Sequence, residues 1–272
     1  MTSPAFPYQL VATDLDGTLL RSDKTISERN RAALASAQRA GAAHIVVTGR
    51  AVPWARHILD SLDYTGLAVC GQGAQLYDAG AHRLLTSVTM DRRTARAAIE
   101  KLEGELGPLL VAVSRDGLDG EVVTSPGYRL ESPLPIDVTD DPERLWAEPI
   151  TRAYIQHDRL DDSELYSAAV ELVGGIGGTV DVTHAGDDTV ELLPPGLSKA
   201  TGLNLAARRL KVTAPGTIAF GDMLNDLPMF AWAGHSVAMG NAHPEVKEAA
   251  DEVTAGNDED GVALVLERLT EK

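Results

Sequence analysis

The chain has a single cysteine, Cys70, among its 272 residues, so it cannot form an intramolecular disulfide and gives no sign of an oxidising compartment. It also lacks an apolar run of the roughly 18 residues that a membrane-spanning helix needs. Residues 1–10 have neither the basic start nor the apolar stretch of a secretory signal peptide. These absences predict a cytoplasmic protein with no membrane partner.

Positive charge is scarce: 24 lysines and arginines face 40 aspartates and glutamates, which gives a net charge of -16. Such a surface repels nucleic acid and anionic lipid, so neither is expected as a main partner. It repels phosphorylated substrates too. A site for such a substrate would therefore need local positive charge, from a metal ion or from well-placed basic side chains.

Strand-like and helix-like segments alternate near both ends of the sequence, which predicts a parallel sheet with right-handed crossovers. The helix expected at 27–40 begins with Ser27 as its N-cap. The expected strands lie at 8–13, 43–47, 67–70, 217–220 and 236–239, and the other expected helices at 52–62, 198–210 and 226–233.

The alternation is interrupted between residues 83 and 190. There, strand-like segments at 84–89, 109–114, 150–156 and 179–183 accompany only two helix-like segments, at 91–106 and 161–173. We interpret residues 83–190 as an α+β unit inserted into a domain made of residues 1–82 and 191–272.

Polar side chains follow three of the expected core strands. Asp14 and Asp16 come after the first strand, Thr48 after the second, and Asp222 after the strand at 217–220. Because ligands bind outside the carboxyl ends of strands in an open α/β sheet, we expect these side chains to converge on one site.

These residue types fit phosphoryl transfer. Asp14, Asp16 and Asp222 are hard oxygen ligands that suit Mg²⁺. An ionised carboxylate can itself attack phosphorus, provided that a metal or a lysine neutralises the repulsion between the two anions. Gly17 and Gly49 would let the backbone approach a phosphate closely.

Two other binding sites are excluded by spacing. Counted from Asp14, a calcium-binding loop of the EF-hand type needs glycine at its sixth position and glutamate at its twelfth, where this chain has Leu19 and Thr25. The run that starts at Gly71 resembles a dinucleotide-binding fingerprint, but Leu76 stands where glycine or alanine is required. A merely solvated acidic loop stays open as the alternative for Asp14 and Asp16.

Four short motifs in this order resemble the signatures of the haloacid dehalogenase-like superfamily, and within it the Cof-type phosphatases. They are Asp14-Leu15-Asp16-Gly17-Thr18-Leu19, Thr48-Gly49-Arg50, Ser198-Lys199, and Gly221-Asp222 with Asn225-Asp226. The likeness continues at residues 239–242 and 260–262. The resemblance implies an α/β protein, in which a Rossmann-like parallel-sheet core (1–82 and 191–272) carries a large inserted α+β cap domain (83–190).

The resemblance also implies a function. It suggests a Mg²⁺-dependent phosphatase that acts on small phosphorylated metabolites (sugar phosphates, or phosphorylated vitamin precursors or cofactors) through an aspartyl phosphate. Asp14 would be the nucleophile, and Asp16 the acid that protonates the leaving alcohol and then activates water. The other implied roles are phosphate binding by Thr48 and Lys199, substrate or phosphate binding by Gly17, Gly49, Arg50 and Asn225, and Mg²⁺ binding by Asp14, Asp16 (through its backbone carbonyl) and Asp222.

The chain departs from the family pattern in two places: Gln72 stands where asparagine is common, and Ala200 follows Lys199 where glycine is usual. Lys199 itself is expected in the first turn of a helix, where a cation opposes the helix dipole; an anion nearby would account for it, and an exposed surface lysine is the alternative. The role of Asp226 is left open.

Two other functions remain possible from the sequence: a phosphotransferase or mutase acting on sugar phosphates, and a non-catalytic protein that binds a phosphorylated metabolite. We expect a monomer or a small homo-oligomer. The candidates for contact with the leaving group are polar residues of the inserted unit, each of which could equally be an ordinary surface residue: Arg115, Tyr128, Arg129, Gln156 and His184.

Overall fold

The computed structural model describes residues 6–130, 134–175, 178–184 and 189–270. The chain divides into two compact units: Met1–Gly49, Ile58–Arg83 and Ser198–Lys272 form the first, and Arg50–His57 and Leu84–Leu197 form the second. In the described part of the chain, no helix is both long and apolar enough to cross a membrane.

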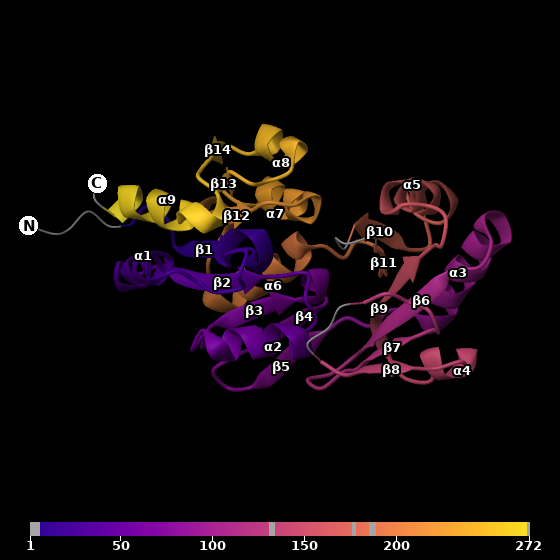
Figure 1. Ribbon diagram of the computed structural model, residues 1–272. Helices are drawn as coiled ribbons and strands as arrows, with labels where there is room; N and C mark the ends of the chain where they lie inside the picture. The colour runs from indigo at the N-terminus through magenta and orange to yellow at the C-terminus, as the bar shows by residue number, and fades with distance from the viewer. Residues whose placement is uncertain (1–5, 131–133, 176–177, 185–188, 271–272) are drawn as a thin grey trace, which may run out of the picture. The chain divides into compact units, whose positions relative to one another are not determined.

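One sheet has the strand order β14-β13-β12-β1-β2-β3-β4-β5, and all of its strands except β5 lie wholly in the first unit (Figure 1). The pairs from β14 to β3 are parallel, whereas β4 runs antiparallel to β3. The strands are β1 (Leu10–Thr13), β2 (Ala43–Val47), β3 (Leu67–Cys70), β4 (Gln75–Asp78), β5 (Arg83–Ser87), β12 (Thr217–Gly221), β13 (His235–Ala238) and β14 (Glu252–Val253).

Helices follow these strands, as the alternation predicted. Ser27 caps α1 by accepting a hydrogen bond from the backbone N–H of Asn30, and Ser198 caps α6 by accepting from that of Thr201. The helices are α1 (Glu28–Arg39), α2 (Val52–Ser61), α6 (Lys199–Leu210), α7 (Leu227–Trp232), α8 (Pro244–Ala249) and α9 (Gly261–Thr270).

Strand β1 lies at the centre of the sheet, completely buried, between β2 and β12. Its last residue, Thr13, is in register with Val46 of β2 and with Phe220 of β12. The chain continues from β1 toward β2 and β3 on one side and later returns through β12 and β13 on the other. The switch in strand order therefore falls between β1 and β12, where open α/β sheets bind ligands.

The second unit contains a sheet with the order β10-β11-β9-β6-β7-β8, antiparallel except for the β7–β8 pair. Alternate residues of β6 and β9, such as Val113 and Ile155, join a buried apolar cluster with residues of α3 and α5. The elements are α3 (Arg92–Leu106), β6 (Leu110–Arg115), β7 (Val122–Thr124), β8 (Ile136–Val138), α4 (Pro142–Leu145), β9 (Ile150–Gln156), α5 (Asp162–Leu172), β10 (Asp181–His184) and β11 (Val190–Leu193).

The α/β fold class with a parallel-sheet core is confirmed, but one boundary differs from the prediction. The boundary expected between residues 190 and 191 falls inside β11, which pairs with β9 and β10 of the second sheet. The second unit therefore continues to Leu197 and also takes in residues 50–57. The assignment of the two units as catalytic core and cap stays a prediction.

Candidate active site

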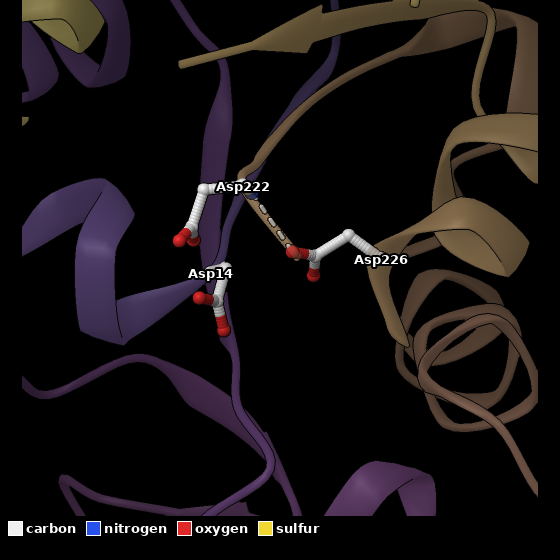
Figure 2. A group of neighbouring side chains, drawn as sticks. All are labelled: Asp14, Asp222 and Asp226. Carbon is white, nitrogen blue, oxygen red and sulfur yellow. Dashed lines mark hydrogen bonds between the residues drawn. The ribbon is translucent and has the colours of Figure 1, made fainter. Parts of the chain in front are cut away.

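Asp14 and Asp222 lie side by side at the carboxyl ends of two adjacent strands. Asp14 directly follows β1, and its backbone N–H donates to the carbonyl of Phe220 in β12 at 2.9 Å. Asp222 directly follows β12. Together with Asp226 they form a buried group whose ligand oxygens all lie within 4.8 Å of one another (Figure 2). The convergence expected from the strand ends is thus observed for these carboxylates.

Lys199 places its ammonium inside this group. Its Nζ atom lies 2.7 Å from Oδ1 of Asp14 and 2.6 Å from Oδ1 of Asp226, and the residue is 2% exposed. The exposed surface lysine that the sequence left as an alternative is therefore wrong. The two buried carboxylates that Lys199 contacts offset the unfavourable position of a cation in the first turn of α6.

The contacts of Asp226 indicate its role, which the sequence left open. Its Oδ2 atom accepts hydrogen bonds from the backbone N–H groups of Asp222 (2.9 Å) and Met223 (3.0 Å), while Oδ1 binds Lys199. Figure 2 shows the bond from the backbone of Asp222. Asp226 thus fixes both the loop that carries Asp222 and the lysine beside Asp14.

The loop after β1 packs against the carboxylate of Asp222. Gly17 has φ 72°, and a Cβ atom there would lie 2.3 Å from Oδ2 of Asp222, so glycine is required for both conformation and space. The hydroxyl of Thr18 donates to Oδ1 of Asp222 at 2.8 Å. The side chain of Asp16 is partly exposed and accepts a hydrogen bond from Lys24 at 3.0 Å.

Three of the predicted phosphate- or substrate-binding residues, Thr48, Gly49 and Asn225, lie close to Gln72, which the sequence flagged only as a departure from the family pattern. Thr48 is buried at the end of β2, and its carbonyl accepts from the backbone N–H of Gln72 at 3.3 Å. A Cβ atom on Gly49 would lie 2.9 Å from Nε2 of Gln72, and the amide of Asn225 donates to Oε1 of Gln72 at 3.2 Å. Arg50 belongs to the segment of the second unit that follows Gly49.

Burial and mutual repulsion shape the ionisation of the carboxylates. Burial raises the pKa of Asp14 well above its usual value; Lys199 opposes this, while Asp226 and Asp222 add to it. Burial, and then Asp226, raise the pKa of Asp222 to about 6. Burial lowers the pKa of Lys199, but the two carboxylates together outweigh it and the pKa is raised, which keeps the ammonium charged.

When its carboxyl groups are ionised, the site carries more negative than positive charge. It holds three buried carboxyl groups and one ammonium, that of Lys199, which pairs with two of them, Asp14 and Asp226. A divalent cation would offset the excess, and clustered carboxylate oxygens are the ligands that Mg²⁺ takes in proteins. The residues present thus fit the metal that the sequence predicted.

Comparisons with known proteins agree on one family. The family model described as haloacid dehalogenase-like hydrolase matches residues 11–266. The 5-amino-6-(5-phospho-D-ribitylamino)uracil phosphatase YwtE of Bacillus subtilis (strain 168) is 31% identical, over 95% of this chain and 97% of that protein. The HMP-PP phosphatase of Cronobacter sakazakii is 27% identical, over 88% and 86%. The solved structure of a haloacid dehalogenase-like hydrolase from B. subtilis is similar with a TM-score of 0.82 at 26% identity, over 96% and 99% of the two chains.

Proposed function

We propose that this chain, which belongs to the haloacid dehalogenase-like hydrolases, hydrolyses small phosphorylated metabolites. Like the relatives that are named phosphatases, it is a phosphoric monoester hydrolase. The proposed reaction uses Mg²⁺ and passes through a phosphorylated Asp14. The observation that supports this most strongly is the contact between Lys199 and Asp14 beside Asp222, at the switch point of the sheet. It joins a candidate nucleophile, a fixed positive charge and a metal-binding carboxylate in one buried place.

In the proposed first step, a carboxylate oxygen of Asp14 attacks phosphorus and the bond from phosphorus to the leaving oxygen breaks. Asp16 gives its proton to that oxygen, so the leaving group departs as an alcohol. In the second step Asp16 takes a proton from water, which attacks phosphorus and releases phosphate and free Asp14. Lys199 offsets the charge of the phosphoryl oxygens in both steps.

Mg²⁺, held by Asp14, Asp222 and the backbone carbonyl of Asp16, would supply further charge neutralisation. Asp226 would then hold Lys199 and the Asp222 loop in place rather than bind the metal, because both of its oxygens already accept hydrogen bonds. Gly17, Gly49, Arg50, Thr48 and Asn225 are the proposed contacts to phosphate and substrate.

We propose that the first unit binds the phosphate and the metal, and that the second unit selects the leaving group. The residues at the strand ends can recognise only phosphate and metal, so the choice of leaving group must come from elsewhere, and we propose the second unit. Among its polar candidates, Gln156 is buried and exchanges hydrogen bonds with the backbone of Arg129 at 3.0 and 2.8 Å. Gln156 also donates to the hydroxyl of Thr189 at 3.1 Å, and Arg129 pairs with Asp158 at 3.5 Å, so these residues have partners within the second unit and stay candidates only. Tyr128 precedes Arg129 and is a candidate as well.

The other two candidates likewise have partners within the second unit. Arg115 pairs with Glu121 and Glu148 at 3.1 and 3.3 Å. His184 stacks on Tyr166 with ring centroids 4.1 Å apart. Relatives named for the dephosphorylation of a ribitylaminouracil phosphate and of HMP-PP support a sugar phosphate or a phosphorylated vitamin precursor or cofactor as the substrate.

The test is a screen of phosphorylated metabolites with Mg²⁺ that measures free phosphate and identifies the organic product. Stoichiometric phosphate and alcohol would support hydrolysis. A new phosphate ester in place of free phosphate would indicate a phosphotransferase, and binding without turnover would indicate a metabolite-binding protein. The cytoplasmic location and the monomeric or small homo-oligomeric state stay predictions.

A further inference from the structure

A cavity of about 210 Å³ in the first unit is lined by α1, by β2 and by the loop of residues 62–66 that leads into β3. Three buried side chains, those of Leu19, Leu34 and Val46, form its apolar wall. Gln38, an exposed residue of α1, also lines the cavity, which therefore reaches the protein surface. The residues that line it have no part in the proposed reaction.

The loop that lines this cavity is fixed by hydrogen bonds. Arg31 of α1 donates to the carbonyl of Leu62 at 3.0 Å. The hydroxyl of Tyr64 donates to the carbonyl of His44 in β2 at 3.0 Å. A Cβ atom on Gly66 would lie 2.5 Å from the same hydroxyl, so a larger residue there would displace the tyrosine. The shape of the cavity is therefore set by the fold.

His44 contributes a hydrogen-bonding atom to this cavity. Its Nε2 atom lies 2.9 Å from the hydroxyl oxygen of Thr13. In the described part of the chain, the other ring nitrogen, Nδ1, has no hydrogen-bond partner, although His44 is only 8% exposed and lines the cavity. Burial lowers the pKa of His44 to about 4, so the ring is neutral near pH 7. Nδ1 is then a donor or an acceptor, according to the tautomer, and is left for a ligand.

The size and the chemistry of the cavity suit a small aromatic molecule better than water. A buried water molecule typically makes about three hydrogen bonds, whereas the buried residues that line this cavity are the apolar wall and His44. An apolar cavity of about 150 Å³ can hold a benzene ring. With about 210 Å³, this cavity has room for one such ring with a small substituent.

We propose that the cavity binds a neutral compound with a single aromatic ring and one hydroxyl group. The ring packs against the apolar wall, and the hydroxyl forms a hydrogen bond with Nδ1 of His44. Because a hydroxyl both donates and accepts, it suits either tautomer of the histidine. Arg31 and Asp63, which carry opposite charges, both line the cavity, so its charge favours a neutral ligand over an anion. The inference does not depend on the proposed reaction.

The test is a titration of the isotope-labelled protein with phenol, in which nuclear magnetic resonance follows the ring nitrogens of His44. We expect saturable shifts with a dissociation constant of about 0.1–1 mM. Toluene, which has a similar size but no hydroxyl, should bind about tenfold more weakly. Unchanged His44 signals at about 10 mM phenol would mean that the cavity holds only water, and the proposal would be wrong. Stronger binding of benzoate than of phenol would overturn the neutral class.

Two tryptophan substitutions on α1 provide a matched pair. Gln38 and Ala32 are both exposed, but of the two only Gln38 lines the cavity. Gln38→Trp should obstruct the cavity and weaken phenol binding by at least about tenfold, whereas Ala32→Trp should leave it unchanged. Equal affinities of the two variants for phenol would contradict binding in this cavity.

His44→Phe separates the hydrogen bond from the packing. The variant keeps an aromatic ring edge-to-face with Tyr64, where the ring centroids are 5.5 Å apart, but it has no ring nitrogen. Phenol and toluene should then bind with similar affinity, measured through the backbone amide of Val46. A persistent preference for phenol would exclude His44 as its partner. Should this variant not fold, the comparison of Gln38→Trp with Ala32→Trp still decides.

Inorganic phosphate distinguishes this cavity from the buried carboxylates. With Mg²⁺ present, saturating phosphate should leave the affinity for phenol unchanged, because the residues proposed to bind the two ions do not line the cavity. Competitive displacement of phenol by phosphate would place the phenol at the carboxylates and overturn the proposal. Phenol binding in a protein that releases no phosphate from any metabolite would support this inference while the proposed function failed.

Discussion

The ammonium of Lys199 lies 2.6 Å from Oδ1 of Asp226, and both side chains are buried. The two residues come from different segments of the chain, one at the start of α6 and the other in the loop after β12. Since Asp226 also accepts two backbone hydrogen bonds from the Asp222 loop, one carboxylate stabilises the lysine and the loop together.

Replacing Asp226 with alanine should therefore destabilise the protein and damage the site. Lys199 keeps Asp14 as a partner, but the backbone N–H groups of Asp222 and Met223 lose their acceptor, which costs about 1–3 kcal/mol of the free energy of unfolding. Urea denaturation would measure this loss, and phosphate release should fall at least about a hundredfold. Asp60→Ala, at an exposed position on α2, is the control and should have little effect on either measurement. Near-normal stability of Asp226→Ala would contradict the structural role.

Asp14→Asn should abolish turnover by at least about a thousandfold without unfolding the protein, because an amide is a poor nucleophile. Lys199 would keep Asp226 as its ionised partner, so the buried ammonium stays paired. The measurements are phosphate release, trapping of the acid-stable or hydroxylamine-sensitive phosphoenzyme, and thermal unfolding. Substantial residual activity in a folded variant would exclude the covalent mechanism.

Removal of the metal should stop hydrolysis. An excess of chelator is expected to eliminate phosphate release, and added Mg²⁺ to restore it. Asp222→Asn should raise the Mg²⁺ concentration required for half-maximal activity by more than about tenfold and also lower the maximal rate. Asp60→Asn, which changes the same charge at an exposed site, should do neither. Full activity of the unaltered protein in excess chelator would refute the metal assignment.

His44 should make the stability of the protein depend on pH. Burial lowers the pKa of His44 from 6.5 to about 4, and its ring contacts the hydroxyl of Thr13 at 2.9 Å. Above pH 6.5 the ring is neutral in both the folded and unfolded states. Below it only the unfolded state binds the proton, so stability falls as pH drops from about 6.5 to about 4.

The expected loss is about 1.4 kcal/mol per pH unit in that window, and about 3 kcal/mol in all. Urea denaturation between pH 7.5 and pH 4.5 would measure it. His44→Gln, which cannot titrate, should lose less stability over the same range, whatever its stability at pH 7.5. Parallel pH profiles of the two proteins would show that His44 becomes charged while folded.

Much of the site could be predicted because each of its strand-end residues directly follows an apolar run. Asp14 and Asp222 were placed together on that ground, and the structure brings them together. The double role of Asp226 could not be predicted, because it depends on which way two carboxylate oxygens point. The contact between Lys24 and Asp16 depends on a left-handed turn that no residue preference signals.

The prediction of secondary structure likewise failed where the result depends on tertiary contacts. Long, well-bounded segments such as β9 were predicted to the residue, whereas β7, β8 and β11 have only three or four residues each and were missed. Every residue of β7 and β11 is buried, so these strands show no alternation of polar and apolar residues, and they form where neighbouring strands offer hydrogen bonds. The missed β11 explains why the boundary of the second unit was placed too early.

The central place of β1 affects the order in which the molecule can be made. During synthesis β1 can pair with β2 almost at once, but its other edge stays open until β12 emerges from the ribosome. Likewise, the hydrogen bond from the hydroxyl of Thr18 to Asp222 can form only after Asp222, 204 residues later, has been synthesised. The second sheet, whose strands all lie between residues 110 and 193, can close in the meantime. A nascent chain therefore completes its central sheet and its set of buried carboxyl groups in the same late event.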